Sequence, residues 1–162
     1  MLLSLTIKNY ALIENLHVNF NNGLSIITGE TGAGKSILLG GLSLILGKRA
    51  DLTVINDTTK KCVVEATFDI ANYNLKSFFK TEDLDYEPQT IIRREILPSG
   101  KSRAFINDTP VNLDSLQILG EHLLDIHSQH QTLQLTNDDF QFQVIDALAD
   151  NSKILQEYSS NL

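Results

Sequence analysis

The sequence predicts an α/β fold, that of a P-loop NTPase with antiparallel β-hairpins, and three observations support this prediction. Residues 29–36 fit the P-loop pattern G-x-x-x-x-G-K-[ST] at every fixed position. A short apolar, β-branched run at 24–28 precedes the pattern and reads as a buried strand, and a largely apolar helix at 37–46 follows it. Several other segments alternate apolar and polar residues, which is typical of strands. Strand, glycine loop and buried helix is the order that a phosphate-binding loop requires.

The residue types in this loop predict how a nucleoside triphosphate would bind. The three glycines carry no Cβ that would block a phosphate, so the N–H groups of residues 30–36 can turn inward as an anion nest. Lys35 is expected to reach the β- and γ-phosphates, and the hydroxyl group of Ser36 is expected to hold Mg²⁺. The expected contact residues are therefore Gly29, Glu30, Thr31, Gly32, Ala33, Gly34, Lys35 and Ser36.

Periodicity predicts the elements on either side of the loop. Alternation favours two antiparallel strands at 2–8 and 16–20, followed by the P-loop strand at 24–28. The helix after the loop is expected to end at Gly47, because glycine suits the residue that follows a helix. Residues 62–70 also alternate, with their apolar side chains on one face.

The remaining segments predict a hairpin, two helices and a strand. Strands at 90–97 and 102–107 flank a four-residue turn, and a helical turn is expected at 75–79. The next helix is expected to be capped by Asp114, with Gln117 in capping-box position, and to end near Gly120 or Glu121. The following segments are expected to form a strand (122–127), a polar loop and an amphipathic helix (138–149).

Two groups of polar residues leave alternatives open. Four cations of the predicted hairpin form the densest positive cluster of the chain, and they fit either a solvated strand face or a contact with phosphate groups. These cations are Arg93, Arg94, Lys101 and Arg103. His127 and His130 have the spacing of a ligand pair, but no third ligand follows at a spacing typical of zinc sites, so a metal site is the weaker explanation.

Composition limits the classes of function. The chain has 162 residues, of which 42% are hydrophobic, and its net charge is −7. This charge provides no global basic field toward nucleic acid, although a local patch can still bind it. No apolar run approaches the ~20 residues of a membrane span. The single cysteine, Cys62, excludes an intramolecular disulfide, fits a reducing cytosol and is expected to be a small buried apolar side chain.

ATP hydrolysis requires groups that the sequence does not clearly supply. A carboxylate should end an apolar strand and hold the Mg²⁺ shell. Asp125 follows only two apolar residues, and Asp146 lies inside a helical pattern. The sequence therefore contains half of an ATPase site. A small P-loop kinase, a P-loop helicase and a binding module that retains the loop remain alternatives at this point.

Several stretches in combination resemble the N-terminal head segment of the SMC-like ABC ATPases, including their branch in bacterial DNA repair. The resemblance covers essentially all of residues 1–150. It implies an N-terminal lobe at 1–150 and the start of a coiled-coil arm at 151–162, within a longer protein. The matching stretches are residues 5–13, 29–36, 47–51, 64–68, 102–107 and 124–130.

The resemblance also implies roles for three further residues. Gln129 matches the glutamine that contacts Mg²⁺ in these ATPases, although Ser128 stands where the family is expected to have glycine. Arg49 and Asn9 match positions near the nucleotide. By the same resemblance, ATP and Mg²⁺ are the expected cofactors, and Lys35 and Gln129 take part in hydrolysis.

The resemblance implies partners and a cellular role as well. The expected partners are the C-terminal lobe of the same head, a second head in a homodimer and DNA, and no membrane. The implied role is in DNA double-strand break repair or recombination, in the cytoplasm at the nucleoid. Hydrolysis is expected to need the C-terminal lobe and head dimerisation, so this chain alone should bind ATP but hardly hydrolyse it.

Overall fold

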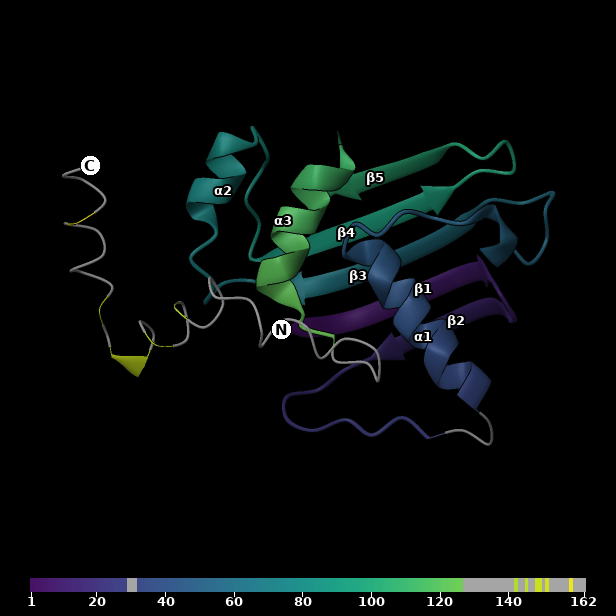
Figure 1. Cartoon of the computed structure of the whole chain (residues 1–162), viewed down its shortest axis with the longest axis horizontal. Helices are drawn as coiled ribbons and strands as arrows, with labels where there is room; N and C mark the ends of the chain where they lie inside the picture. The colour runs from purple at the N-terminus through teal and green to yellow at the C-terminus, as the bar shows by residue number, and fades with distance from the viewer. Residues whose placement is uncertain are drawn as a thin grey trace. The chain divides into compact units, whose positions relative to one another are not determined.

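The computed structural model describes residues 1–28 and 32–126, together with residues 142, 145, 148, 149, 151 and 158 (Figure 1). The side chains of residues 32, 33 and 52 are not described. The chain divides into two compact units, Met1–Asp125 and Ile126–Leu162. The first unit contains every strand and helix that is named below.

A six-stranded antiparallel sheet, in the order β2-β1-β3-β4-β5-β6, forms the first unit. Its register is continuous across the centre, where Val64 of β3 pairs with Ile7 of β1 and with Arg94 of β4. The expected antiparallel pairing of the first two strands and the hairpin after residue 89 are confirmed. The strands are β1 (Leu2–Tyr10), β2 (Ile13–Asn19), β3 (Cys62–Asp69), β4 (Gln89–Ile96), β5 (Ser102–Ile106) and β6 (Thr109–Val111).

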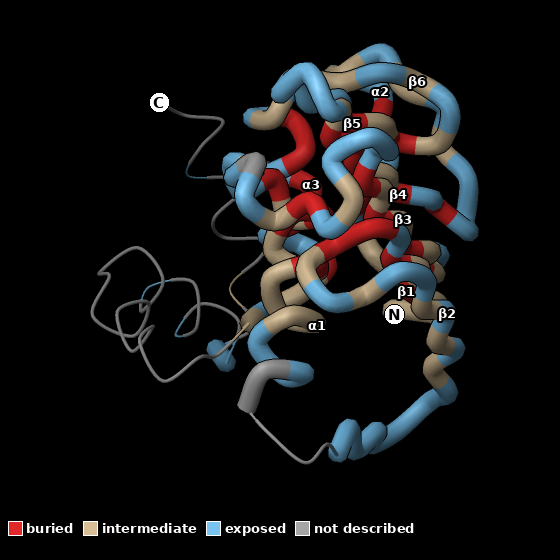
Figure 2. The backbone as a smooth tube through the Cα atoms, turned by 90° about the vertical axis from the view of Figure 1, so that its right-hand side faces the viewer, coloured by how far each residue is buried: buried red, intermediate tan, exposed pale blue. Residues whose placement is uncertain are grey.

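Helices α1 (Gly32–Ile45) and α3 (Leu113–Leu123) lie over one face of the sheet (Figure 1). The short helix α2 (Lys76–Thr81) and the 3-10 turn η1 (Leu52–Val54) complete the first unit. The core lies between this face and the helices, as the buried segments of Figure 2 show. Strand β3 alternates buried and half-buried residues along its whole length, as its sequence predicts. Cys62 is fully buried, as expected.

Close packing fixes α1 against β1. A Cβ added at Gly40 would collide with the Tyr10 hydroxyl oxygen, and one at Gly41 would lie 2.8 Å from the Cδ1 atom of Ile7. A side chain at either position would require Tyr10 or Ile7 to shift, so the two glycines allow a close approach of helix and strand.

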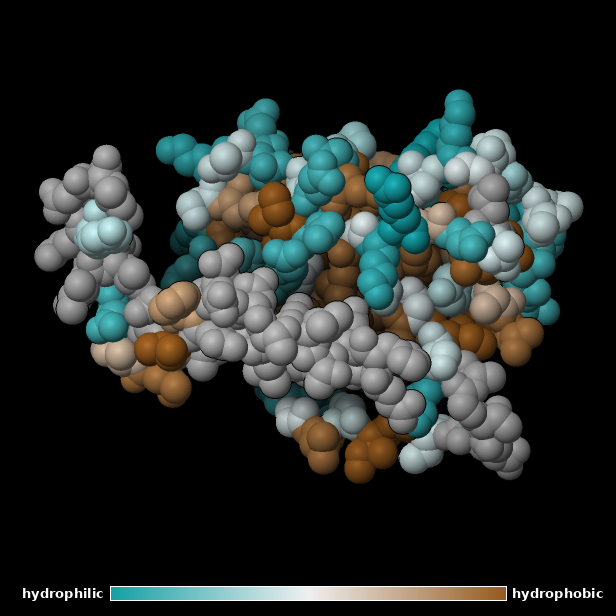
Figure 3. Space-filling view, in the orientation of Figure 1, coloured by the Kyte–Doolittle hydropathy of each residue, from teal (hydrophilic) through white to brown (hydrophobic). Residues whose placement is uncertain are grey.

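The predicted P-loop strand at 24–28 is wrong for this structure. These residues form no strand, and Leu24 and Ile26 are 89% and 77% exposed. Figure 3 shows hydrophobic side chains along the lower edge, where Figure 1 places the segment between β2 and α1. A strand needs a neighbour for its N–H and C=O groups, and no described segment pairs with this one. The apolar pattern was correct, but a pattern alone supplies no pairing partner.

Two predictions around α3 are also wrong. The cap is Asn112, whose Oδ1 atom accepts a hydrogen bond from Ser115 N at 2.7 Å, so the helix begins before Asp114. The helix then continues to Leu123, and residues 124–126 form no strand. The reason is the helical spacing of the side chains Leu116, Leu119 and Leu123, all of which are buried in the core.

In the second unit, the few described residues include helical ones. Phe142, Ile145 and Leu148 are helical and exposed, and Ala149 N donates to Ile145 O at 2.9 Å. Most of the predicted helix at 138–149 and of the predicted arm at 151–162 lies outside the described residues. The expected domain boundary at residue 150 stays a prediction.

Candidate nucleotide-binding site

The first turns of α1 carry the two polar side chains of the P-loop pattern. Lys35 and Ser36 are both exposed there. Gly34, just before them, has no atom within 4 Å of an added Cβ, so a ligand can approach its backbone. The structure therefore brings Lys35 and Ser36 together at one end of a helix, on a surface open to a ligand.

The electrostatics of this helix end favour an anion. The first N–H groups of a helix have no partner within the helix, and the helix dipole is positive there. The first turn of α1 contains no acidic residue that would compete for these groups. The residues present thus fit the phosphate groups of a nucleotide, with Lys35 as the cation and the Ser36 hydroxyl as an oxygen ligand for Mg²⁺.

The side chain of Asn9 is engaged within the protein. Its Nδ2 atom donates to Asp57 O at 2.9 Å and Lys60 O at 3.0 Å, and its Oδ1 atom accepts from Asp57 N at 2.7 Å. An amide has two donor hydrogens, and both are used. Asn9 is buried with a φ of 54°, which asparagine tolerates better than most residues. The Asn9 side chain therefore links loop 57–60 to the end of β1 through three hydrogen bonds.

The loop that Asn9 holds is itself ordered by Asp57. The Asp57 carboxylate accepts hydrogen bonds from the Thr59 N–H and hydroxyl groups and pairs with the Lys60 ammonium at 2.9 Å. These donors, with the Thr59 hydroxyl bond first, lower the pKa of Asp57 to about 2. The sequence did not reveal this link between β1 and the loop, because no local pattern relates residues so far apart.

Arg49 lies at the other end of α1 from Lys35. It is exposed and follows Gly47, which ends the helix with a φ of +85° as expected. A helix rises ~1.5 Å per residue, so roughly 15 Å of α1 lies between Lys35 and Ile45, and Arg49 follows beyond that end. The structure does not bring Arg49 and Lys35 together, and a nucleotide contact by Arg49 stays a prediction.

Several predicted site residues lie outside the described part of the chain. They are Gly29, Glu30, Thr31 and the proposed sensor Gln129, together with Ser128, His127 and His130. Among the described residues, no group of three or more histidine, cysteine or acidic side chains is arranged to hold a metal ion. Within the same residues, no helix is long and apolar enough to cross a membrane.

The four cations of the predicted cluster do not share one surface, because Arg94 is buried. Adjacent residues of a strand point to opposite faces, so Arg94 turns into the protein while Arg93 stays on the other face. Arg93 lies 3.8 Å from carboxylate oxygens of both Glu65 and Glu95, and its guanidinium lies 4.7 Å from the ring centre of Phe105. Acids on the outer face therefore partly neutralise Arg93.

Comparison with solved structures defines the class of this fold. It is similar, with a TM-score of 0.61 and 17% identity, to a structure from work on ATP-driven dimerisation and DNA-stimulated activation of SMC ATPases. That match covers 91% of this chain and 98% of the other. The SMC head domain from Thermotoga maritima gives a TM-score of 0.54 at 17% identity, covering 73% and 41%. The fold is that of an SMC-type ATPase head lobe, which confirms the predicted fold class.

Sequence comparison gives the family. The chain belongs to the AAA domain family, whose match spans residues 4–162. It is 36% identical to the DNA repair protein RecN of Haemophilus influenzae and 38% identical to that of Vibrio cholerae, over 96% of this chain in both cases. RecN of Bacillus subtilis is 38% identical over 92%.

These relatives are much longer than this chain, so the similarity concerns only one part of each relative. The chain spans only 28% of the first two proteins and 26% of the third. The predicted resemblance to the SMC-like ATPases of DNA repair is confirmed. It favours an ATPase head over the small P-loop kinase, the helicase and the binding module.

Proposed function

We propose that this chain is the ATP- and Mg²⁺-binding N-terminal part of a RecN-like SMC-family ATPase that acts in DNA double-strand break repair. The observation that carries the proposal is the start of α1, where exposed Lys35 and Ser36 follow the glycine pattern and the first helical turn contains no acidic residue. Similarity to RecN over almost the whole chain supports the same conclusion.

ATP hydrolysis then requires residues beyond these 162. The exposed apolar run at 24–28 supports this part of the proposal, because an apolar segment without a strand partner is suited to pair with another part of the head. A C-terminal lobe of the same protein and a second head would supply the missing carboxylate and complete the site. DNA is the partner of the whole assembly, at the nucleoid in the cytoplasm.

The direct experiment compares binding with turnover on the 162-residue chain. Calorimetry should detect ATP binding in the presence of Mg²⁺, while steady-state phosphate release should stay far below the ~1–10 s⁻¹ of ordinary enzymes. Ordinary turnover by this chain alone would refute the conclusion that it holds half of a site.

The role of Lys35 is tested by Lys35→Ala, with Lys48→Ala as the matched control. Both lysines are exposed, but Lys48 lies beyond the opposite end of α1. A hydrogen bond to a charged group contributes ~1.5–3 kcal/mol, so Lys35→Ala should weaken ATP binding by roughly 10- to 150-fold. Its melting temperature should not change. Equal affinities of the two variants would contradict the proposed contact.

Gln129 is proposed to bind the Mg²⁺ shell through its amide oxygen and to couple nucleotide state to the rest of the head. In the full-length protein, Gln129→Ala should leave ATP binding within a few-fold and depress DNA-stimulated turnover. Normal stimulation by DNA in this variant would show that Gln129 has no such role.

A further inference from the structure

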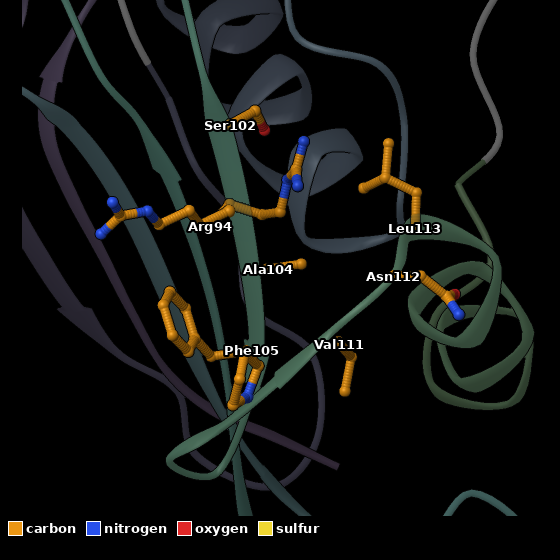
Figure 4. A pocket seen from close by; sticks show the side chains of 9 residues that line it. Arg94, Ser102, Ala104, Phe105, Val111, Asn112 and Leu113 are labelled. Carbon is orange, nitrogen blue, oxygen red and sulfur yellow. The ribbon is translucent and has the colours of Figure 1, made fainter.

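A cavity lies where the chain leaves the sheet to enter α3 (Figure 4). Its volume is about 500 Å³, within the range of ~300–1,000 Å³ that small-molecule sites have. All residues that line it belong to β4, β5, β6 and the start of α3. They are Arg94, Ser102, Arg103, Ala104, Phe105, Pro110, Val111, Asn112 and Leu113.

The guanidinium of Arg94 is the unusual group in this cavity. The residue is 1% exposed, and its Nε and Nη2 atoms have no hydrogen-bond partner among the described residues. The neighbouring acid of the same strand, Glu95, lies on the opposite face and pairs with Lys61 at 2.8 Å. A buried charge without a partner costs several kcal/mol, so an unpaired guanidinium at this position requires an explanation.

Burial lowers the pKa of the Arg94 guanidinium, because desolvation disfavours its charged form. Two of its cross-strand neighbours, Val64 and Ala104, are buried and apolar and give it no counter-charge. Arg94 thus lines a cavity whose other walls are partly apolar, and two of its donor nitrogens are buried and unused.

The beginning of α3 adds a second feature that favours an anion. Asn112 caps this eleven-residue helix, and both Asn112 and Leu113 line the cavity. The positive end of the helix dipole therefore lies at the cavity wall. Of the acids nearest to this helix end, Asp114 lies in the first turn, and Glu82 accepts a hydrogen bond from the Ser115 hydroxyl. Neither acid lines the cavity.

We propose that this cavity is a second anion site, in which Arg94 binds a phosphate or carboxylate group through its two unpaired nitrogens. The planar guanidinium can donate two parallel hydrogen bonds to either group, and the charge of the guanidinium strengthens both bonds. The cavity is built from residues 94–113 and shares none of them with α1. The site is therefore independent of the nucleotide proposed above.

The test uses the 162-residue chain carrying Lys35→Ala, so that the P-loop contributes little to phosphate binding. Its melting temperature is measured against inorganic phosphate and, separately, against acetate, each balanced with sodium chloride. At ten times the dissociation constant, either ligand should raise the melting temperature by about 3–5 °C. Phosphate and acetate are compared to determine which oxyanion the site prefers.

Two variants in the same background assign the effect. Arg94→Met keeps the length of the side chain and removes the charge, so the rise with ligand should disappear. Without ligand, this variant should melt at the same temperature or higher, because an unpaired buried charge has been removed. Lys101→Gln also removes one cation of the hairpin but does not line the cavity, and it should behave like its parent.

A second measurement is made on the chain with Arg94 intact, and a conservative substitution at Arg94 serves only to assign the signal. In the Lys35→Ala chain, the Nε–H resonances of the arginines are followed by NMR as phosphate or acetate is added. One buried resonance should shift and saturate, and its loss in Arg94→Lys assigns it. The proposal is overturned if no arginine resonance saturates with either anion. An equal ligand-dependent rise in melting temperature with Arg94→Met also overturns it.

Discussion

Replacing Gly47 by alanine should loosen the contact that holds the end of α1 against α3. Gly47 completes the turn after the helix, where its N–H donates to Leu44 O at 3.2 Å and that of Lys48 to Ser43 O at 3.0 Å. Its φ is +85°, and an added Cβ would lie 2.9 Å from the backbone nitrogen of Gln117 in α3. A backbone atom cannot move aside as the end of a side chain can.

The expected loss has two parts. A side chain at positive φ costs ~1–2 kcal/mol, and forcing a methyl group against a packed backbone costs ~1–3 kcal/mol. The free energy of unfolding should therefore fall by ~2–5 kcal/mol. Since proteins of this size are stable by only ~5–15 kcal/mol, the variant should unfold at a clearly lower urea concentration.

The measurement is urea unfolding followed by circular dichroism, with Gly23→Ala as the control. Gly23 has a φ of +99° but no atom within 4 Å of an added Cβ. Both substitutions change the entropy of the unfolded chain alike, so the difference between them isolates the contact with α3. Equal losses of unfolding free energy in the two variants would refute the reasoning.

Three further predictions concern single side chains. Burial raises the pKa of the Cys62 thiol to about 11, so iodoacetamide at pH 8 should alkylate it only after urea unfolding, and rapid alkylation of the native chain would contradict this. Asn9→Ala removes three hydrogen bonds to loop 57–60 and should lower the urea-unfolding free energy by ~2–4 kcal/mol, whereas a loss below ~0.5 kcal/mol would mean that water replaces them. The pKa of Asp57 in the folded chain, about 2, lies below its ordinary 3.8. The carboxylate therefore stabilises the fold fully above pH 4, and this effect fades as the pH falls toward 2. The urea midpoint of Asp57→Asn should vary less over that range than that of the unchanged chain, and parallel plots of midpoint against pH would refute the assignment.

The sequence predicted the sheet well wherever one face of a strand is buried. Strands β1 and β3 have such faces, and their alternation determines both the element and its register. Alternation also located the β4–β5 hairpin, because its turn at 98–101 carries the proline and glycine that such turns favour. Local information was sufficient in these cases because each pattern repeats over several residues.

Prediction failed where the outcome depends on a distant partner. The run at 24–28 has the composition of a buried strand, but no described segment pairs with it. Residues 122–126 are apolar enough for a strand, yet Leu123 belongs to the buried face of α3. The cap of α3 is Asn112 and not Asp114. Both side chains can accept a hydrogen bond at the start of a helix, so the residue types alone did not distinguish them.

Dependence on distant contacts also explains which features of the two candidate sites the sequence did not reveal. Lys35 and Ser36 were located from the motif because their roles depend on adjacent residues. The engagement of Asn9 with loop 57–60 and the burial of Arg94 depend on contacts across the sheet. For Arg94 one signal was present: it alternates with Ile92 and Ile96, which predicts an inward side chain, but the neighbouring cations suggested a surface cluster.

The strand order has a consequence for how this chain folds. Strands β1–β2 and β4–β5–β6 are hairpins whose partners are close in sequence, but β1 pairs with β3 only after the chain has passed through the glycine loop, α1 and loop 57–60. Closing such a loop costs entropy before any of its contacts form, and contacts between distant residues slow folding. The β1–β3 ladder is therefore the step expected to limit the folding rate. Because Gly41 of α1 packs beside both Ile7 of β1 and Val64 of β3, α1 is expected to reach its final position only when that step is complete.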